Sequence, residues 1–264
     1  MNTLDPGGLW PVFRELEQVA AAETLPRFRT VIDVENKADT APFDPVTEAD
    51  RAAERAIRAT LARHFPDHGV SGEEGDDVKG SGAWSWIVDP IDGTRSFISG
   101  MPTWGTLVGL LEDGVPRFGM MSQPYVGECF LGGGGKAEWF RGDESRLLRC
   151  RAVSNLGQAT LFATSPDMFA PGFEADAFSR LSDQTQLTRF GADCYGYVLL
   201  AAGFVDLVVE ANLGFYDVAP VIPIVEAAGG CVSDWAGQPV RSGGRAVAAA
   251  NEALLEQALS SLGA

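Results

Sequence analysis

The stretch Trp84-Ser85-Trp86-Ile87-Val88-Asp89-Pro90-Ile91-Asp92-Gly93-Thr94 joins an apolar run to a turn that carries two carboxylates and a hydroxyl. The aromatic and β-branched residues 86–88 predict a short buried strand, which the proline and glycine then end. Such a strand delivers Asp89 to its C-terminal edge. Hard divalent cations such as Mg²⁺ prefer carboxylate oxygens, so this turn predicts a metal site. The alternative is that Asp-Pro and Asp-Gly are ordinary turn dipeptides.

Two acidic clusters precede this stretch. Gly72-Glu73-Glu74-Gly75 follows the short run Gly69-Val70-Ser71, which predicts a second strand ending at an acidic loop, with Glu74 facing water. Asp44-Pro45-Val46-Thr47-Glu48-Ala49-Asp50 leads into apolar residues at helical spacing. Thr47 and Asp50 have the spacing of a capping box, which alone would explain both residues.

A third cluster follows later in the chain. Tyr216-Asp217-Val218-Ala219-Pro220 opens the apolar segment 221–228, which ends at Gly229-Gly230. We expect Asp217 to be the N-cap of this helix, and capping alone would again explain it.

Taken in order, the four clusters resemble the signature of the inositol monophosphatase superfamily of metal-dependent phosphatases. The matching blocks are Asp-x-Val-Thr-x-x-Asp at 44–50, Gly-Glu-Glu at 72–74, Trp-Ile-Val-Asp-Pro-Ile-Asp-Gly-Thr at 86–94, and aromatic-Asp followed by Glu-Ala-Ala-Gly-Gly at 216–230. The resemblance runs from about Trp10 to the C-terminal helix. It implies an α/β fold with α+β layers, arranged as an αβαβα sandwich in a single domain over residues 1–264.

Two segments resemble the histidinol-phosphate phosphatase branch of this superfamily. One is the segment from Thr94 to Leu107, where inositol phosphatases typically carry Thr-Asn-Phe after Asp-Gly-Thr. The other is Gly191-Ala192-Asp193-Cys194-Tyr195, where they usually carry a small residue at the position of Asp193.

The resemblance implies a set of metal ligands. Glu73, Asp89 and the backbone carbonyl of Ile91 match the ligands of a first Mg²⁺ ion, and Asp89, Asp92 and Asp217 match those of a second, with Asp89 bridging. A third, weaker ion would also contact Glu73, and Mn²⁺ is expected to substitute for Mg²⁺. Two such ions can acidify a water and neutralise the leaving alkoxide of a phosphate ester.

The resemblance also implies catalytic and substrate-binding residues. Thr94, paired with Asp50, matches the hydroxyl that helps to activate the attacking water, and Glu73 belongs to the same catalytic set. The amides of Gly93 and Thr94 match a phosphate cradle. The predicted substrate-binding residues are Gly93, Thr94, Arg95, Asp193, Glu210 and Asp217.

Three of these residues are interpreted from their neighbours. Residues 204–209 read as a buried strand that would deliver Glu210 to its C-terminal end. Asp193 adds a carboxylate that would favour the ammonium and imidazole of histidinol phosphate. Its alternative role is the N-cap of the helix that follows. Arg95 either contacts substrate or pairs with a local acid.

Composition limits the partners. A net charge of −16 over 264 residues argues against nucleic acid and anionic membranes, and it makes bound cations necessary for a phosphorylated substrate. The four cysteines form no Cys-x-x-Cys pair, so neither a zinc site nor a disulfide framework is expected, and Cys194 is expected to be a buried thiol. Without an N-terminal signal or long apolar run, a cytoplasmic location is expected. A homodimer is implied by the resemblance only.

Periodicity predicts the order of elements. Helices are expected over about residues 9–25 and 47–65. An N-terminal half, about 1–150, has short strands at 106–111, 118–122, 129–131 and 137–140 joined by Gly- and Pro-containing turns, which predicts an antiparallel sheet. In a C-terminal half, about 151–264, strands at 161–164, 186–190, 204–209, 231–233 and 246–249 alternate with helices at 173–181, 193–202, 221–228 and from 252.

Three functions follow. The favoured one is a Mg²⁺-dependent phosphomonoesterase that hydrolyses L-histidinol phosphate in histidine biosynthesis. Its nearest alternative is an inositol-1-phosphate or broad sugar-phosphate phosphatase. An alternative of another class is a non-hydrolytic protein that binds a phosphorylated ligand on a phosphatase scaffold.

Overall fold

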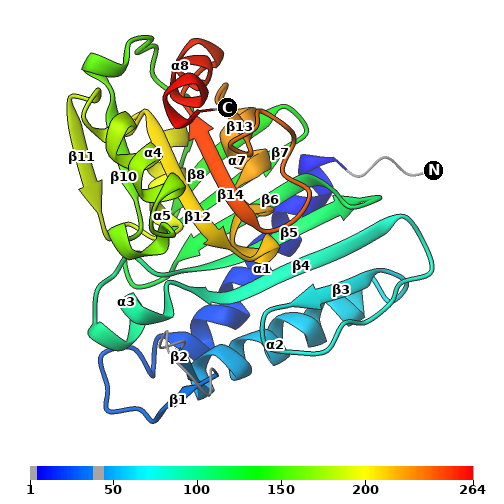
Figure 1. Cartoon of the computed structure of the whole chain (residues 1–264). Coiled ribbons are helices and arrows are strands. Elements are labelled where there is room, and N and C mark those ends of the chain that lie inside the picture. Colours follow the sequence, from blue (N-terminus) through cyan, green and yellow to red (C-terminus); the bar gives the residue numbers. More distant parts are fainter. Residues whose placement is uncertain (1–4, 38–44, 264) are drawn as a thin grey trace.

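A seven-stranded sheet forms the first β layer of the computed structural model, which describes residues 5–37 and 45–263 (Figure 1). Its strands, in spatial order, are β3 (Gly69–Gly72), β4 (Trp84–Asp92), β5 (Gly105–Glu112), β6 (Val115–Gln123), β7 (Glu128–Gly133), β8 (Lys136–Arg141) and β9 (Glu144–Leu147). Every neighbouring pair is antiparallel except β3 and β4, which run parallel. The predicted antiparallel sheet is therefore confirmed.

A five-stranded sheet forms the second β layer. Its spatial order is β11 (Leu187–Phe190), β10 (Thr160–Ala163), β12 (Leu207–Leu213), β14 (Gly244–Ala249) and β13 (Cys231–Ser233). Strand β10 runs parallel to β11 and β12, and β14 runs antiparallel to β12 and β13. Two short strands, β1 (Val34–Asn36) and β2 (Pro45–Thr47), pair separately. Asp44, the first residue of the predicted block at 44–50, lies outside the described residues.

Helices fill three layers around these sheets. They are α1 (Pro6–Thr24), α2 (Glu48–His64), α3 (Thr94–Ser99), α4 (Phe173–Ser182), α5 (Tyr195–Ala201), α6 (Phe215–Val218), α7 (Ile222–Ala227) and α8 (Glu252–Leu262), with 3₁₀ turns at Leu156–Gln158 and Pro166–Met168. One apolar core joins α1 and α2 to the seven-stranded sheet. A second joins α5 and α7 to both sheets, and a third joins α4 and α8 to the outer face of the five-stranded sheet. The order of layers is thus αβαβα, as predicted.

Strand alternation explains why β4 and β12 can be covered on both faces. Trp86 and Val88 of β4 face the core with α1 and α2, whereas Ile87 packs on the other side with Ala219. Val208 of β12 faces the middle layer, and its neighbours in sequence face α8. Because side chains of a strand point alternately to opposite faces, an uninterrupted apolar run is what a doubly covered strand requires.

Two glycines let the segment that carries Asp217 approach the first sheet closely. A Cβ on Gly119 of β6 would lie 1.8 Å from the carbonyl oxygen of Pro220, and one on Gly132 of β7 would lie 2.3 Å from the Cα of Ile224. Such distances are not tolerated between non-bonded atoms, so only glycine fits at these two positions. The sheet therefore fixes the depth at which α6 and α7 lie.

Two strand boundaries differ from the prediction. Strand β4 does not end at Pro90 but continues to Asp92, with a register shift between Asp89 and Asp92 where it pairs with β5. Proline has no backbone N–H to donate, and it is tolerated at such an irregularity because no ladder hydrogen bond is required from that position. Glu210 lies in the middle of β12 and not at the end of its strand, because β12 continues to Leu213.

Candidate active site

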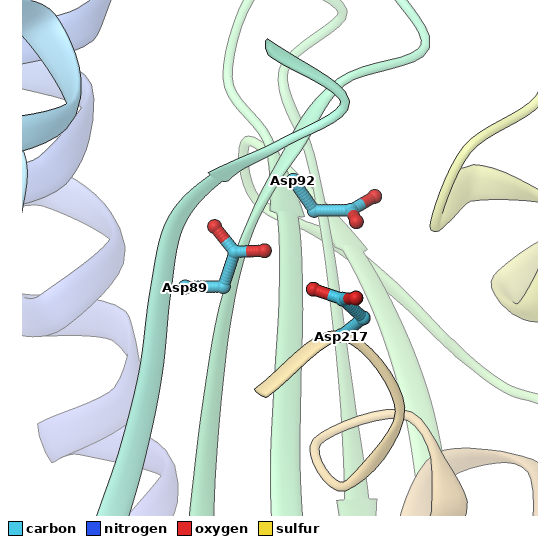
Figure 2. A group of neighbouring side chains, drawn as sticks. All are labelled: Asp89, Asp92 and Asp217. Atoms are coloured by element: carbon cyan, nitrogen blue, oxygen red, sulfur yellow. The ribbon is translucent and has the colours of Figure 1, made fainter. Parts of the chain in front are cut away.

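Three aspartates converge between the two sheets. Asp89 and Asp92 lie on either side of the β4 irregularity, and Asp217 lies on α6; each offers a carboxylate oxygen, and these oxygens all lie within 4.8 Å of one another. Figure 2 shows the three side chains pointing into a shared space from β4 and from the short helix α6. Residues about 125 positions apart in sequence thus supply one group of oxygens.

Backbone amides hold each of these carboxylates. Asp89 Oδ1 accepts a hydrogen bond from the amide of Ile91 (3.0 Å), and Asp92 Oδ2 accepts one from the amide of Cys194 (2.7 Å). Asp217 Oδ2 accepts one from the amide of Gly214 (2.7 Å). The N-cap prediction for Asp217 is therefore wrong: Gly214 is the N-cap of α6, and Asp217 occupies the third helical position and reaches back to it.

The proximity of the three carboxylates is electrostatically costly. Burial raises the pKa of Asp89, and the charges of Glu73, Asp92 and Asp217 raise it further. Burial and the charge of Asp217 likewise raise the pKa of Asp92, and burial raises that of Asp217 to about 7. Like charges this close ionise together only beside a positive charge. The oxygen-only donor set and its excess negative charge fit a hard divalent cation.

Glu73 reaches the same edge of the first sheet from β3. Its amide donates to the carbonyl of Val88 on β4 (3.1 Å), and its Oε1 accepts from Lys37 Nζ (2.7 Å). Lys37 also forms an ion pair with Glu74. Burial alone would lower the pKa of Lys37, but these two carboxylates outweigh it and raise that pKa. The lysine thus holds the carboxylate of Glu73.

The prediction that Glu74 faces water is wrong. Its side chain is 8% exposed, because Lys37 covers the carboxylate. Burial raises the pKa of Glu74 to about 7, and the charge of Glu73 adds to the effect. An acidic residue in a short loop looks solvent-exposed in a sequence, and only the tertiary partner reveals otherwise.

Thr94 lies beside Asp50 at the start of α3. Its Oγ1 lies 3.4 Å from Asp50 Oδ1 and 3.1 Å from the carbonyl oxygen of Ile91. The second carboxylate oxygen of Asp50 accepts from the amide and hydroxyl of Thr47, at 2.8 and 2.6 Å, which confirms the capping box. Asp50 is buried, and burial raises its pKa. One oxygen of Asp50 therefore caps α2 while the other faces Thr94.

Gly93 and Asp193 are in contact beside this turn. Gly93 has a φ of 81°, and a Cβ added to it would lie 2.8 Å from Cγ of Asp193. Asp193 itself has a φ of 46°, and its Oδ2 accepts from the hydroxyls of Ser96 (2.6 Å) and Thr103 (2.8 Å). The alternative that Asp193 is a helix N-cap is wrong, because Cys194 holds that position and α5 has no side-chain cap.

Glu210 and Arg95 are the remaining residues predicted to bind substrate. Glu210 is buried and accepts from the amide of Thr164 (3.1 Å), the hydroxyl of Thr164 and the hydroxyl of Tyr197 (2.8 Å). Burial raises the pKa of Glu210. Arg95 lies on the exposed side of α3. Cys194 is buried, as predicted, and the four cysteines are free.

Lys37, Ser96, Thr103 and Tyr197 are site neighbours that the sequence reasoning missed. The one feature of the sequence that could have revealed them is a polar group near a matched motif or inside an apolar run. Tyr197 in α5 is an example of the latter. Surface hollows of about 430 and 900 Å³ lie elsewhere, lined among others by Trp84 and by Arg149. Chemistry rather than cavity size therefore identifies the site.

The αβαβα layers and the partly buried carboxylate group together define a metal-dependent phosphatase that acts on small phosphorylated substrates. The chain belongs to the inositol monophosphatase family, whose model matches residues 10–263. In the described residues, no helix is both long and apolar enough to cross a membrane.

Relatives and solved structures agree with this membership. Bifunctional phosphatase IMPL2, a chloroplastic protein of Arabidopsis thaliana, is 39% identical over 89% of this chain and 69% of its own length. A histidinol-phosphatase of Chlorobaculum parvum is 34% identical over 94% of both chains. The structure of an inositol monophosphatase from Zymomonas mobilis is similar with a TM-score of 0.84 and 38% identity over 96% of both chains.

Proposed function

We propose that this protein hydrolyses L-histidinol phosphate to L-histidinol and inorganic phosphate, in histidine biosynthesis, with Mg²⁺ as its cofactor. The observation that carries the proposal is the contact of the Asp193 carboxyl group with Gly93, the residue whose amide we assign to the phosphate. An acid beside the phosphate suits a substrate with an ammonium and an imidazole, whereas neutral inositol gains less from it. The similarity to the histidinol-phosphatase of Chlorobaculum parvum supports this choice.

We assign the cation ligands to the three aspartates around the shared space and, from the family resemblance, to Glu73 and the carbonyl of Ile91. Asp89, Asp92 and Asp217 would hold one Mg²⁺; Glu73, Asp89 and the carbonyl of Ile91 would hold another, and a third, weaker ion would contact Glu73, with Mn²⁺ able to substitute. Bound Mg²⁺ supplies the positive charge that acidifies water and neutralises both the phosphate and the leaving oxygen. Lys37 contacts Oε1 of Glu73, so Oε2 is the oxygen that we assign to the cation.

The chain's own groups orient the reacting water and the ester. The Thr94 hydroxyl can donate toward Asp50, at 3.4 Å, which leaves a lone pair to accept a hydrogen from the attacking water. The amides of Gly93 and Thr94 hold the phosphate oxygens. The water oxygen then forms a bond to phosphorus as the bond from phosphorus to the alcohol oxygen breaks. The water gives up one proton through Thr94 toward Asp50, and the departing oxygen takes one from solvent water, so the protons balance.

We assign the other end of the substrate to Asp193, Glu210 and Arg95. Asp193 keeps Oδ1 available, because Ser96 and Thr103 both donate to Oδ2. Glu210 is fixed by Thr164 and Tyr197 and places a buried carboxyl group near Asp193, and burial and the charge of Asp193 both raise its pKa. Arg95, on the exposed side of α3, would lie at the mouth of the site.

Parallel kinetics test the substrate. We expect kcat/KM for histidinol phosphate to exceed that for inositol 1-phosphate and for neutral sugar phosphates, and phosphate release to stop in EDTA. The second candidate, an inositol-1-phosphate or broad sugar-phosphate phosphatase, is favoured by the similarity to the Zymomonas mobilis enzyme. A kcat/KM for inositol 1-phosphate equal to or above that for histidinol phosphate would select it. Ligand binding without phosphate release would instead favour the non-hydrolytic alternative.

The single domain over residues 1–264, the homodimer and the cytoplasmic location stay predictions. Sedimentation velocity at micromolar concentration tests the dimer directly, and we expect twice the mass of the 28.1 kDa chain.

A further inference from the structure

One face of α2 carries three polar side chains at four-residue spacing, Asp50, Glu54 and Arg58. Residues four apart in a helix lie above one another, so the three form a single row. Asp50 faces Thr94 at one end of the row. Glu54 is buried, 2% exposed, and it does not touch the three aspartates of the site.

The carboxylate of Glu54 binds the loop that follows β3. Its Oε2 accepts from the amide of Glu74 (2.9 Å) and its Oε1 from the amide of Gly75 (3.0 Å). The fit is tight, since a Cβ on Gly72 would lie 2.4 Å from Oε1 of Glu54. Amide bonds to a buried carboxylate are stronger than neutral ones, so this contact fixes the loop backbone.

Arg58 completes the contact from the next turn of α2. Its Nε donates to Glu54 Oε1 (2.6 Å), while its two terminal nitrogens donate to the carbonyls of Asp76 (3.0 Å) and Gly75 (3.1 Å). The pair therefore binds the amides and the carbonyls of one short segment. Removing Arg58 would leave the buried carboxylate of Glu54 without its ion-pair partner.

We propose that the Glu54–Arg58 pair is a positioning device that sets Glu73 for cation binding. The Glu73 amide bonds to Val88 on β4, and the next two amides along the chain bond to Glu54, so the backbone is fixed on both sides of Glu73. Because Asp50 belongs to the same helix as Glu54 and Arg58, α2 fixes the position of Glu73 relative to Asp50. This inference rests on the proposed role of Glu73 as a ligand.

A merely structural role for the pair makes a different prediction. If Glu54 only stabilised the fold, its replacement would lower the melting temperature without a selective effect on the cation. If it positions Glu73, its replacement weakens cation binding, and a saturating cation restores turnover. The change in cation affinity, compared with the change in turnover at saturating cation, distinguishes the two roles.

The test is Glu54→Gln, with Glu48→Gln as the matched control. Glu48 lies on the exposed side of α2 and pairs with Arg55 of the same helix, so Glu48→Gln makes the same chemical change in α2 away from the loop. The neutral amide that replaces the Glu54 carboxylate can accept from only one of the two loop amides at full strength. Free Mn²⁺ is measured by electron paramagnetic resonance without substrate, and kcat is measured at saturating Mg²⁺.

We expect Glu54→Gln to raise the Kd for Mn²⁺ at least about tenfold, roughly the effect of one charge-assisted hydrogen bond. We expect its kcat at saturating Mg²⁺ to stay within about threefold of wild type, and Glu48→Gln to change neither quantity. A wild-type Mn²⁺ affinity in a folded Glu54→Gln protein would overturn the inference. So would a kcat at saturating Mg²⁺ that falls as much as the affinity.

Two further variants keep the test decisive. Should Glu54→Gln fail to fold by circular dichroism, Arg58→Lys takes its place, because lysine keeps the charge but loses the fork that binds two carbonyls; the same criteria then apply to it. Glu73→Gln separates this inference from the proposed function. If Glu73→Gln leaves Mn²⁺ affinity unchanged, the ligand assignment itself fails; if Glu73→Gln weakens binding and Glu54→Gln does not, only the positioning role fails.

Discussion

The hydroxyl oxygen of Thr94 lies 3.4 Å from Oδ1 of Asp50, although the two residues are 44 positions apart and belong to α3 and α2. The other oxygen of Asp50 is held by Thr47, so the carboxylate cannot turn away from Thr94 without breaking the cap of α2. The start of α2 and the start of α3 are thereby joined at one carboxylate.

The first prediction concerns this hydroxyl. Thr94→Ala should lower kcat about 100-fold, because oriented proton acceptors contribute roughly 10²–10⁴ to such reactions. Thr94→Ser keeps the hydroxyl and should recover most of the rate. The measurement is steady-state kcat on histidinol phosphate at saturating Mg²⁺. Equal rates for the alanine and serine variants would show that the hydroxyl has no part in the reaction.

The second prediction concerns the charge of Asp92. Asp92→Asn should lower kcat at least about 100-fold, since a cation contributes several kcal/mol to charge stabilisation and each 1.36 kcal/mol is tenfold in rate. Asp113→Asn, in the exposed turn between β5 and β6, is the control and should leave kcat unchanged. Near-normal turnover of Asp92→Asn with either Mg²⁺ or Mn²⁺ contradicts its assignment as a ligand.

Local signals predicted most of the architecture. The apolar run before Asp89 indicated a buried strand, the Thr47 and Asp50 pair indicated the start of α2, and the turn-separated strands indicated an antiparallel sheet. Each of these three predictions depends only on residues that are close together in the sequence, within about the length of one helix or strand. The order of acidic blocks then predicted the family and layers, which the comparisons confirm.

Long-range contacts explain what the sequence did not predict. The pairing of β4 with β5 decides that the strand passes Pro90, and Lys37 decides that Glu74 is covered. Asp193 does not cap α5, because its carboxylate accepts hydrogen bonds from Thr103 and Ser96, which lie about 90 to 97 residues away in the sequence. Strand β9, with every residue exposed, carries no apolar alternation that could have revealed it.

The third prediction concerns specificity. Asp193→Ala removes the carboxyl group that contacts Gly93, so KM for histidinol phosphate should rise about tenfold or more, a typical loss for one charge-assisted contact. KM for a neutral sugar phosphate should rise less. Because Asp193 has a φ of 46°, Asp193→Asn, which tolerates this conformation, controls for backbone strain and should also lose the preference. Equal changes in KM for both substrates would remove Asp193 from recognition.

The fourth prediction links pH, stability and the cation. The pKa values of Asp89, Asp92 and Asp217 are raised in the folded chain, that of Asp217 to about 7. A carboxyl group with a raised folded pKa contributes stability below its unfolded pKa, about 3.9, and that stability is lost as pH rises through the folded value. The cation-free protein should therefore lose stability between about pH 4 and the raised pKa values.

Mg²⁺ offsets this loss, because it binds the ionised carboxylates and releases their protons. The rise in melting temperature on replacing EDTA with saturating Mg²⁺ should be larger at pH 8 than at pH 5.5. Comparing the rise instead of the melting temperature itself cancels the effect of titrating groups remote from the site. Asp92→Asn removes one of the repelling charges and should shrink the difference between the two pH values. A rise of the same size at both pH values would mean that the three aspartates are not the groups that bind the cation.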